Sequence, residues 1–214
     1  MRASVPNRGR FITLEGPDGA GKSTQAQLVA DTLRAHGKEV VTTREPGGTA
    51  VGNRLRQVLL DPQTPLQPTT ETLLMFAARA EHVAHVIEPA LAAGRWVVCD
   101  RFTDSTFAYQ GDGRGIAKGA IETLAAFTHA HCWPDLTLCL DVPPATAAGR
   151  MQERTLDGFE REDDGFYRRV REGFLKQAAR EARIVVIDGS SALEVVSKAV
   201  QHAVETFIRR TEAA

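Results

Sequence analysis

The chain has 214 residues, of which 43% are hydrophobic and 25% charged, an average composition that excludes a disordered or collagen-like protein. Its 26 basic and 27 acidic side chains give a formal net charge of −1. This near-neutral charge excludes a strong overall positive potential, which would attract the protein to nucleic acid or to an anionic membrane. The length fits one globular domain, predicted at residues 11–214 behind a loose N-terminal tail at residues 1–10.

Short apolar segments with strand character alternate with longer helical patterns. In chain order, we predict a strand at residues 11–14, a helix at 23–36, a strand at 40–43, a helix at 71–93, strands at 96–99 and 136–140, a helix at 164–182, a strand at 184–187 and a helix at 193–209. Strands this apolar are typical of strands buried on both faces. The alternation predicts an α/β fold, with a five-stranded parallel sheet and helices on both faces.

The segment at about residues 150–164 differs from the rest of the predicted helical regions. It is crowded with charged residues, contains Gly158 and has few apolar side chains that could pack. We predict that this segment is a mobile lid.

A phosphate-binding motif follows the first predicted strand. Residues 16–23 read G-P-D-G-A-G-K-S, which matches G-x-x-x-x-G-K-[ST] between a strand and a helix, the context that the motif requires. Backbone N–H groups would converge on phosphate oxygens, Lys22 would reach the outer phosphates and Ser23 would ligate Mg²⁺. The alternative is a glycine-rich turn with no ligand. The predicted ATP-binding residues are Gly16, Pro17, Asp18, Gly19, Ala20, Gly21, Lys22, Ser23, Thr24 and Arg150.

The rest of the chain narrows the class of P-loop protein. None of the five lysines follows Asn or Thr, so the N-K-x-D or T-K-x-D motif that reads guanine is absent. Asp100 and Arg101 directly follow the predicted strand at residues 96–99, and open α/β sheets bind ligands at this end of their strands. Asp100 could hold magnesium and Arg101 could grip an acceptor phosphate, although an ordinary ion pair is the alternative.

With these residues assembled, the chain resembles the bacterial thymidylate kinases over essentially its whole length. Residues 43–49 look like the family's T-R-E-P-G-G-T signature. Residues 100–111 look like its D-R-[YH]-x-x-S-x-x-A-Y-Q-G block, and residues 134–143 resemble its P-D-L-T-x-x-L-D-[VL]-P segment. The order and spacing of these segments also agree with the family.

The resemblance implies a nucleoside monophosphate kinase fold of the P-loop NTPase type and ATP-dependent phosphorylation of dTMP to dTDP, a step in dTTP biosynthesis. It also implies Mg²⁺ as cofactor and a homodimer. Arg79 would hydrogen-bond thymine, Tyr109 would lie under the deoxyribose and Asp18 would lie near its 3′-hydroxyl or the magnesium shell. The implied dTMP-binding residues are Asp18, Glu45, Pro46, Arg56, Phe76, Arg79, Arg101, Ser105, Thr106, Tyr109 and Gln110.

Phosphoryl transfer needs positioning and electrostatic stabilisation more than bond-making groups. The predicted catalytic residues are Lys22, Asp100, Arg101 and Arg154, and the predicted magnesium ligands are Ser23 and Asp100. Two positions depart from the family pattern. Phe102 stands where Tyr or His is usual, and Gly158 stands where the lid commonly carries an arginine. Charge in the transition state is therefore expected to be met by Arg150, Arg154 or Arg161.

Histidines and cysteines add no second site. His129, His131 and Cys132 lack a suitably spaced fourth ligand for zinc, and His82 and His85 are interpreted as ordinary polar positions of one helix. An odd number of cysteines without a C-x-x-C pair argues against a disulfide framework. No apolar run approaches the roughly 20 residues that span a bilayer. We therefore expect a cytoplasmic protein that has neither a membrane nor nucleic acid as a partner.

Two other functions stay open at this point. The protein could be a P-loop kinase of another small acceptor, such as a deoxynucleoside, adenylate or shikimate. It could also be a non-catalytic protein that uses bound ATP only to order an interaction surface. The segments at residues 43–49 and 100–111 favour thymidylate over both alternatives.

Overall fold

A computed structural model describes residues 8–151, without the side chain of Met151, and residues 163–213. Its centre is a five-stranded sheet in which every pair of neighbours is parallel, in the order β2–β3–β1–β4–β5. The strands are β1 (Phe11–Glu15), β2 (Val40–Arg44), β3 (Trp96–Asp100), β4 (Leu136–Asp141) and β5 (Ile184–Asp188). All five predicted strands are confirmed.

Each strand is one residue longer than predicted, because the apolar segment ends one residue before the backbone hydrogen bonding of the sheet does. The added residues are all charged, and they lie together at the carboxyl edge of the sheet: Glu15, Arg44, Asp100, Asp141 and Asp188. A buried parallel sheet can place charges only at its ends, where loops and ligands meet them. The fold therefore brings a row of charged groups to one edge.

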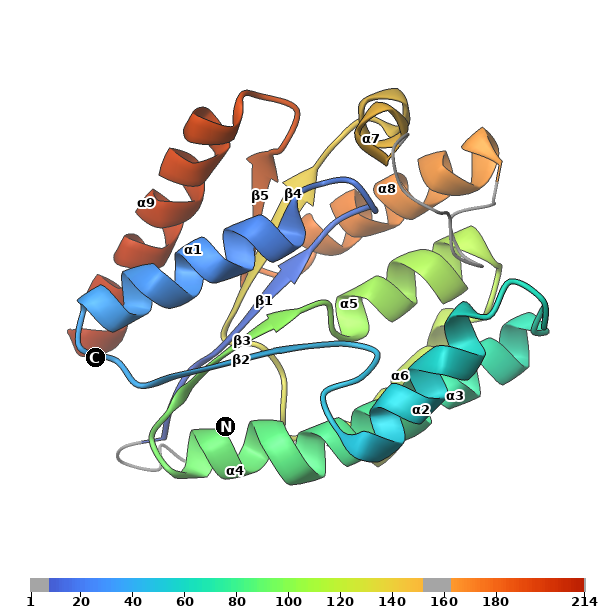
Figure 1. Ribbon diagram of the computed structural model, residues 1–214, viewed down its shortest axis with the longest axis horizontal. Helices are drawn as coiled ribbons and strands as arrows, with labels where there is room; N and C mark the ends of the chain where they lie inside the picture. The colour runs from blue at the N-terminus through green and yellow to red at the C-terminus, as the bar shows by residue number, and fades with distance from the viewer. Residues whose placement is uncertain (1–7, 152–162, 214) are drawn as a thin grey trace.

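Helices cover both faces of the sheet (Figure 1). They are α1 (Lys22–Ala35), α2 (Ala50–Leu60), α3 (Pro68–His82), α4 (Glu88–Ala92), α5 (Thr103–Thr106), α6 (Lys118–His129), α7 (Pro144–Met151), α8 (Asp164–Ala178) and α9 (Leu193–Glu212). Two π-helical turns, η1 (Val83–Ile87) and η2 (Phe107–Gly113), continue α3 and α5. The predicted helix at residues 71–93 is the continuous run of α3, η1 and α4, which begins earlier, at a proline that suits a helix N-terminus.

Neighbouring residues of β1 pack into different layers. Ile12 and Leu14 share a core with Leu33 of α1 and Val204 of α9, on one face of the sheet. Phe11 belongs to a second core that contains the η1 and α4 side chains on the opposite face. The prediction of strands buried on both faces is confirmed for β1, β3 and β4. It is wrong for the edge strands β2 and β5, which are partly exposed because only one neighbouring strand covers each of them.

Helices α2 and α6 are absent from the sequence-based prediction. They are short, with 11 and 12 residues, and each also exposes apolar residues: Val51 and Val58 in α2 and Phe127 in α6. Thr49 caps α2 by accepting a hydrogen bond from the backbone N–H of Gly52 at 2.9 Å. A helix of three turns gives only a short periodic signal, which is harder to recognise than that of the 20-residue helix α9.

Two regions of the prediction fall partly outside the described residues. Of the N-terminal tail, Gly9 donates its backbone N–H to the carbonyl oxygen of Leu91 at 2.8 Å, and residues 1–7 are not described. Of the predicted lid, residues 152–162 are not described, so Arg154, Gly158 and Arg161 lie outside. The single-domain boundary and the lid stay predictions.

Candidate active site

The phosphate-binding loop connects β1 to α1. Gly16, Gly19 and Gly21 have positive φ angles of 130°, 76° and 87°, which side chains with a Cβ rarely adopt. At Gly16 a Cβ would also approach the carbonyl oxygen of Leu140 to 2.4 Å. These glycines let the loop wrap around the N-terminus of α1, where free backbone N–H groups and the helix dipole favour an anion. The loop therefore has the geometry that its sequence motif predicts.

Lys22 is the first residue of α1 and is held inside the loop. Its Nζ donates to the carbonyl oxygen of Pro17 at 2.8 Å and lies 3.9 Å from Asp18. Burial and the nearby positive charge of Arg101 lower the pKa of Lys22 to about 8. A bound polyphosphate would supply the negative charge that favours the protonated ammonium.

The two predicted magnesium ligands meet at the end of β3. The Ser23 hydroxyl donates to Asp100 Oδ2 at 2.7 Å, so an alcohol oxygen and a carboxylate oxygen lie together beside the loop. In the described part of the chain, no three His, Cys, Asp or Glu residues could hold a metal. This donor set fits Mg²⁺, which is usually bound through one or two protein oxygens together with substrate phosphates.

Arg101 turns away from Asp100. Its φ angle is +70°, a left-handed conformation that is unusual for a residue with a long side chain. Its guanidinium donates to Asp18 Oδ1 at 2.5 Å, to Ser105 Oγ at 3.0 Å, to Tyr109 Oη at 3.1 Å and to a loop carbonyl. Asp100 and Arg101 therefore do not form the ordinary pair considered from the sequence.

Asp18 and Tyr109 complete this cluster. The Tyr109 hydroxyl donates to Asp18 Oδ2 at 2.8 Å, and the Tyr109 ring lies 4.9 Å from the Arg101 guanidinium carbon. Burial alone would raise the pKa of Asp18, but the charges of Arg101 and Lys22 outweigh it and bring the pKa well below its usual range. A guanidinium, a carboxylate and a phenol thus converge next to the phosphate-binding loop.

A cavity of about 80 Å³ opens beside this cluster. It is lined by Asp18, Arg56, Leu60, Met75, Arg101, Ser105, Tyr109 and Gln110. Six of these belong to the predicted dTMP-binding set, and the apolar residues Leu60 and Met75 do not. Pro46 lies close by, since Arg56 Nη1 donates to its carbonyl oxygen at 3.0 Å.

The other predicted acceptor residues are buried behind this cavity. The Arg79 guanidinium lies between the rings of Phe76 and Phe102, with its carbon 4.8 Å and 5.1 Å from the two centroids. Its Nε donates to Glu45 at 2.7 Å and its Nη2 to Thr106 at 3.1 Å. Phe76 is 2% exposed, so it packs in the core as well as flanking Arg79.

Two buried polar atoms here lack a protein partner among the described residues: Arg79 Nη1 and Gln110 Oε1. The Gln110 amide is fixed, because its Nε2 donates to Glu71 at 2.8 Å. An unsatisfied buried donor or acceptor costs about 1–3 kcal/mol. Each of these side chains is held in place by a carboxylate. The open donor of Arg79 and the open acceptor of Gln110 therefore suit a ligand that carries one hydrogen-bond acceptor and one donor.

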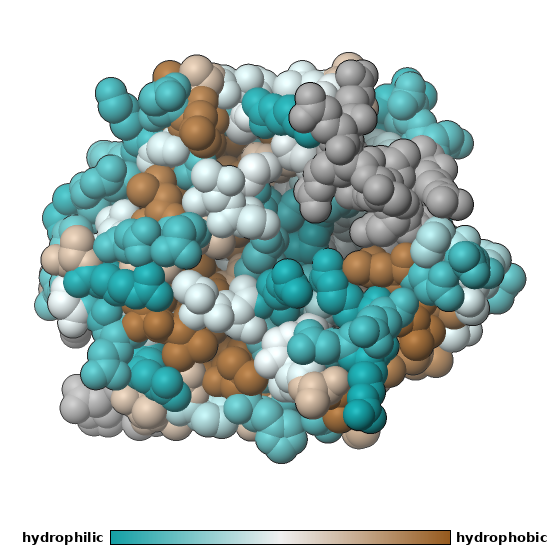
Figure 2. Space-filling model, viewed as in Figure 1, coloured by the Kyte–Doolittle hydropathy of each residue, from teal (hydrophilic) through white to brown (hydrophobic). Residues whose placement is uncertain are grey.

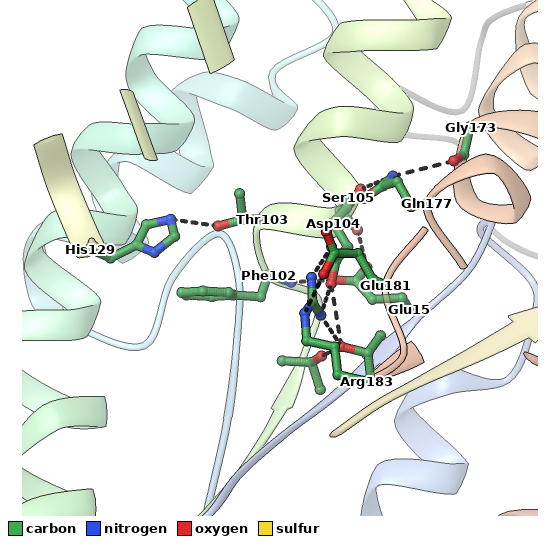
Figure 3. A network of polar contacts seen from close by, with 12 residues as sticks. Glu15, Phe102, Thr103, Asp104, Ser105, His129, Gly173, Gln177, Glu181 and Arg183 are labelled. Carbon is green, nitrogen blue, oxygen red and sulfur yellow. Dashed lines mark hydrogen bonds and ion pairs between the residues drawn. The ribbon is translucent and has the colours of Figure 1, made fainter. Parts of the chain in front are cut away.

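Figure 3 shows a second polar network, which includes the residues that directly follow Arg101 in the chain. Glu15, at the end of β1, accepts hydrogen bonds from the backbone N–H of Phe102 at 2.7 Å and from Ser105 Oγ at 2.5 Å. Asp104 forms a two-pronged ion pair with Arg183, with both distances 2.8 Å. Burial and then the charge of Asp104 raise the pKa of Glu15 to about 8. This network anchors the residues that follow Arg101, and sequence reasoning missed Glu15, Asp104 and Arg183.

On the donor side, a cavity of about 370 Å³ lies between the loop and the start of α9. Gly19, Ala20, Gly21, Thr24 and Arg150 line it, as the ATP-binding prediction requires. Arg150 is held by a hydrogen bond from its Nη1 to the carbonyl oxygen of Gly189 at 2.9 Å. The residues after β5, Gly189 and 191–193, also line this cavity and were missed, because they form a plain turn without a motif.

The histidines behave differently from one another. His129 is buried and its Nε2 contacts Thr103 Oγ1 at 2.8 Å, which agrees with a packed side chain. The interpretation of His82 as an ordinary polar position is wrong. It is fully buried, with Nδ1 2.9 Å from Glu45 Oε1 and Nε2 2.6 Å from Thr43 Oγ1. The position of His82 on α3 could not indicate this burial, because its partners come from β2 and from the loop that follows β2.

No helix in the described part of the chain is long and apolar enough to cross a membrane. The three cysteines, Cys99, Cys132 and Cys139, are buried and form no disulfide with one another.

Comparisons with known proteins agree with this geometry. The Thymidylate kinase family profile matches residues 14–200. A curated thymidylate kinase of Methylobacillus flagellatus is 52% identical over 202 residues, covering 94% of this chain and 98% of that protein. One of Chromohalobacter salexigens is 54% identical over 197 residues, covering 90% and 93%. The crystal structure of thymidylate kinase from Ehrlichia chaffeensis superposes with a TM-score of 0.71 at 37% identity, covering 86% of this chain and 94% of that one. The chain therefore belongs to the thymidylate kinase family.

Proposed function

We propose that the protein transfers the γ-phosphoryl group of ATP to the phosphate of dTMP, forming dTDP, and that it does so with Mg²⁺ in the active site. ATP-dependent phosphorylation of dTMP is the activity of the family to which the chain belongs. The observation that carries the proposal is the meeting of the phosphate-binding loop, Asp100 and the Arg101 cluster at one edge of the sheet. The cavity lined by the loop and Arg150 would hold the phosphoryl donor, and the cavity lined by Asp18 and Arg101 would hold the acceptor.

On the donor side, the loop amides and Lys22 would hold the polyphosphate of ATP. Ser23 and Asp100 would hold Mg²⁺, which when bound neutralises charge on the phosphate oxygens. Arg150 would border the nucleoside end of ATP, because it lines the donor cavity of about 370 Å³. Because the acceptor phosphate is largely dianionic at neutral pH, no strong general base is required.

On the acceptor side, Arg101 would bind the phosphate of dTMP. Its terminal nitrogens donate to Ser105 and Asp18 in this structure, so a bound phosphate would take over donors that these contacts now use. Asp18 and Tyr109 would then face the deoxyribose, Asp18 as an acceptor for the 3′-hydroxyl. The left-handed conformation of Arg101 supports this role, because backbone strain of this kind is concentrated at functional sites.

The base pocket supports thymine as the ligand. Thymine carries a carbonyl oxygen that needs a donor and a ring N–H that needs an acceptor, which matches the open Arg79 Nη1 and Gln110 Oε1. A site built to hydrogen-bond a group rejects analogues that lack it, because its own buried atoms are then left unpaired. The catalytic role of Arg154 falls outside the described residues and stays a prediction.

Acceptor profiling tests the proposal. With ATP and Mg²⁺, a coupled ADP-release assay across nucleoside monophosphates is expected to give the highest kcat/KM with dTMP, and chelation of the metal with EDTA is expected to abolish turnover. Higher turnover with adenylate than with dTMP would contradict the substrate assignment. ATP binding without turnover of any monophosphate would favour a non-catalytic protein.

We also propose a homodimer built on α2, α3 and α6. These helices lie side by side, and each carries an exposed apolar residue in the set Val51, Val58, Leu73 and Phe127. Brown apolar surface is visible in the lower right of Figure 2, where α2 and α3 lie in Figure 1. The Phe127 side chain is 88% exposed, which is unusual for a large aromatic residue on a monomer surface.

Phe127→Glu is expected to shift the protein from dimer to monomer, because the substitution replaces the most exposed side chain of the apolar surface with a charged one. Light scattering coupled to size-exclusion chromatography measures the mass directly. Val195→Glu is the matched control, since Val195 is 57% exposed but lies on α9, on the other side of the sheet. A monomeric wild-type protein at micromolar concentration would rule out the dimer.

The absence of a disulfide between the three cysteines also supports the predicted cytoplasmic location, because proteins of reducing compartments rarely contain disulfides.

A further inference from the structure

A chain of buried side chains links β2 to the base pocket through α3. Thr43 Oγ1 lies 2.6 Å from His82 Nε2, and His82 Nδ1 lies 2.9 Å from Glu45 Oε1. Glu45 Oε2 in turn accepts from Arg79 Nε at 2.7 Å. His82, Glu45 and Arg79 are all at most 5% exposed, so no water competes for these contacts. The open Nη1 of Arg79 is the last atom of the chain.

The direction of each hydrogen bond follows from the charge of Glu45. Burial alone would raise the pKa of Glu45, but the charge of Arg79 and the hydrogen bond from His82 outweigh it and hold the pKa below its usual range. The ionised carboxylate can only accept, so His82 Nδ1 must donate to it. In the neutral imidazole, Nε2 then accepts from the Thr43 hydroxyl. His82 is therefore oriented from both sides.

The loop that follows β2 is shaped around the imidazole. A Cβ on Gly48 would lie 2.5 Å from His82 Cδ2 and Nε2 and 2.9 Å from Thr43 Oγ1. Gly48 also has a φ angle of +81°. The second glycine of the segment at residues 43–49 thus gives His82 the room that it occupies.

Glu45 has two oxygens, and each has one strong partner. One holds Arg79 Nε, and the other is held by His82. Without His82, the carboxylate would keep a single tether and could rotate, and the guanidinium would follow it. Since Arg79 Nη1 is the donor proposed for the thymine carbonyl, the position of His82 bears on how the base is read.

We propose that His82 is a positioning residue that sets base discrimination, by fixing Glu45 so that Arg79 presents Nη1 to the carbonyl oxygen of the acceptor base. The proposal rests on the proposed function, because it concerns the base of dTMP. His82 itself does not touch the substrate.

His82→Leu tests this role, because it keeps similar bulk but removes the donor to Glu45. The KM for dTMP is expected to rise about tenfold, the effect of losing one charge-assisted hydrogen bond, with the KM for ATP unchanged. The ratio of kcat/KM for dTMP to that for dCMP should fall by a similar factor. An amino group replaces the carbonyl in cytosine, so a displaced Arg79 costs dCMP little.

His82→Asn is the conservative variant, because its amide nitrogen can occupy the place of Nδ1 and donate to Glu45. It is expected to restore the KM for dTMP and the base ratio to within about threefold of wild type. His85→Leu is the control for the same helical run, since the His85 side chain is 67% exposed. It should change neither quantity, and thermal unfolding shows which variants are folded.

Thr43→Val tests the positioning role of His82 if the His82→Leu protein does not fold. It leaves the imidazole in place but removes the partner of Nε2, and the base ratio should fall by about threefold. An unchanged base ratio in a folded His82→Leu protein, or in Thr43→Val when the former does not fold, would overturn the proposal. Failure of the wild-type protein to phosphorylate dTMP would instead refute the proposed function itself.

Discussion

Replacing Lys22 with methionine is expected to lower kcat by about 10²–10³, the usual effect of removing one preorganised donor from a site of charge development. Lys22 is 7% exposed and is held by the carbonyl oxygen of Pro17 at 2.8 Å, so its ammonium is fixed before ATP arrives. Methionine fills a similar volume, and the helix that begins at this residue should therefore persist. Steady-state kinetics in a coupled ADP-release assay give kcat and both KM values.

The control for this variant is Lys38→Met. Lys38 forms a surface ion pair with Glu212 at 2.7 Å, with side-chain exposures of 24% and 56%, and lies at the far end of α1 from the loop. Its removal should change kcat by less than about twofold, since exposed pairs contribute little. If Lys22→Met retained more than about a tenth of the wild-type kcat, Lys22 would bind the nucleotide without acting in the transfer step.

Glu45→Ala is expected to lower the free energy of unfolding by about 3–5 kcal/mol, because it leaves the Arg79 guanidinium without a counter-charge in the core. The side chains of Arg79 and Glu45 are 2% and 4% exposed and lie 2.7 Å apart. This loss is a large part of the roughly 5–15 kcal/mol that stabilises a typical domain. Urea titration followed by circular dichroism measures it, with the dTMP KM rising in the fraction that stays folded.

Arg34→Ala provides the comparison for the loss of an ion pair at the surface. Arg34 and Asp31 lie 2.9 Å apart but are 46% and 58% exposed, so this loss should cost less than about 1 kcal/mol. The pKa of Glu45 is held below its usual value, so its stabilisation is present at neutral pH and is lost as the pH falls through the lowered pKa. A Glu45→Ala protein as stable as Arg34→Ala would contradict the buried pair.

The sheet and the phosphate-binding loop could be predicted because their signals are local. Five apolar segments identified the five strands, and residues 16–23 identified the loop from a contiguous motif. Helices α2 and α6 were not predicted, because they have only 11 and 12 residues and their periodic signal is short. No pattern in the sequence indicates which surface would form the interface of a dimer.

The acceptor site was predicted in outline, since the resemblance supplied the residues around Arg101 and Arg79. What these residues do depends on contacts between distant segments. Arg101 binds Asp18, 83 positions away, and His82 binds Glu45, 37 positions away. Neither pairing has a spacing that a helix or strand imposes. Both arise because the carboxyl ends of β1, β2 and β3 meet at one edge.

By itself, therefore, the sequence determined the fold class, the phosphate-binding loop and membership of the thymidylate kinase family, because these depend on contiguous patterns. Only the tertiary structure decided that Asp100 binds Ser23 while Arg101 turns to Asp18, and that His82 is buried against Glu45. The order β2–β3–β1 and the left-handed backbone at Arg101 produce these contacts. Both are consequences of how the whole chain packs, and no local segment encodes them.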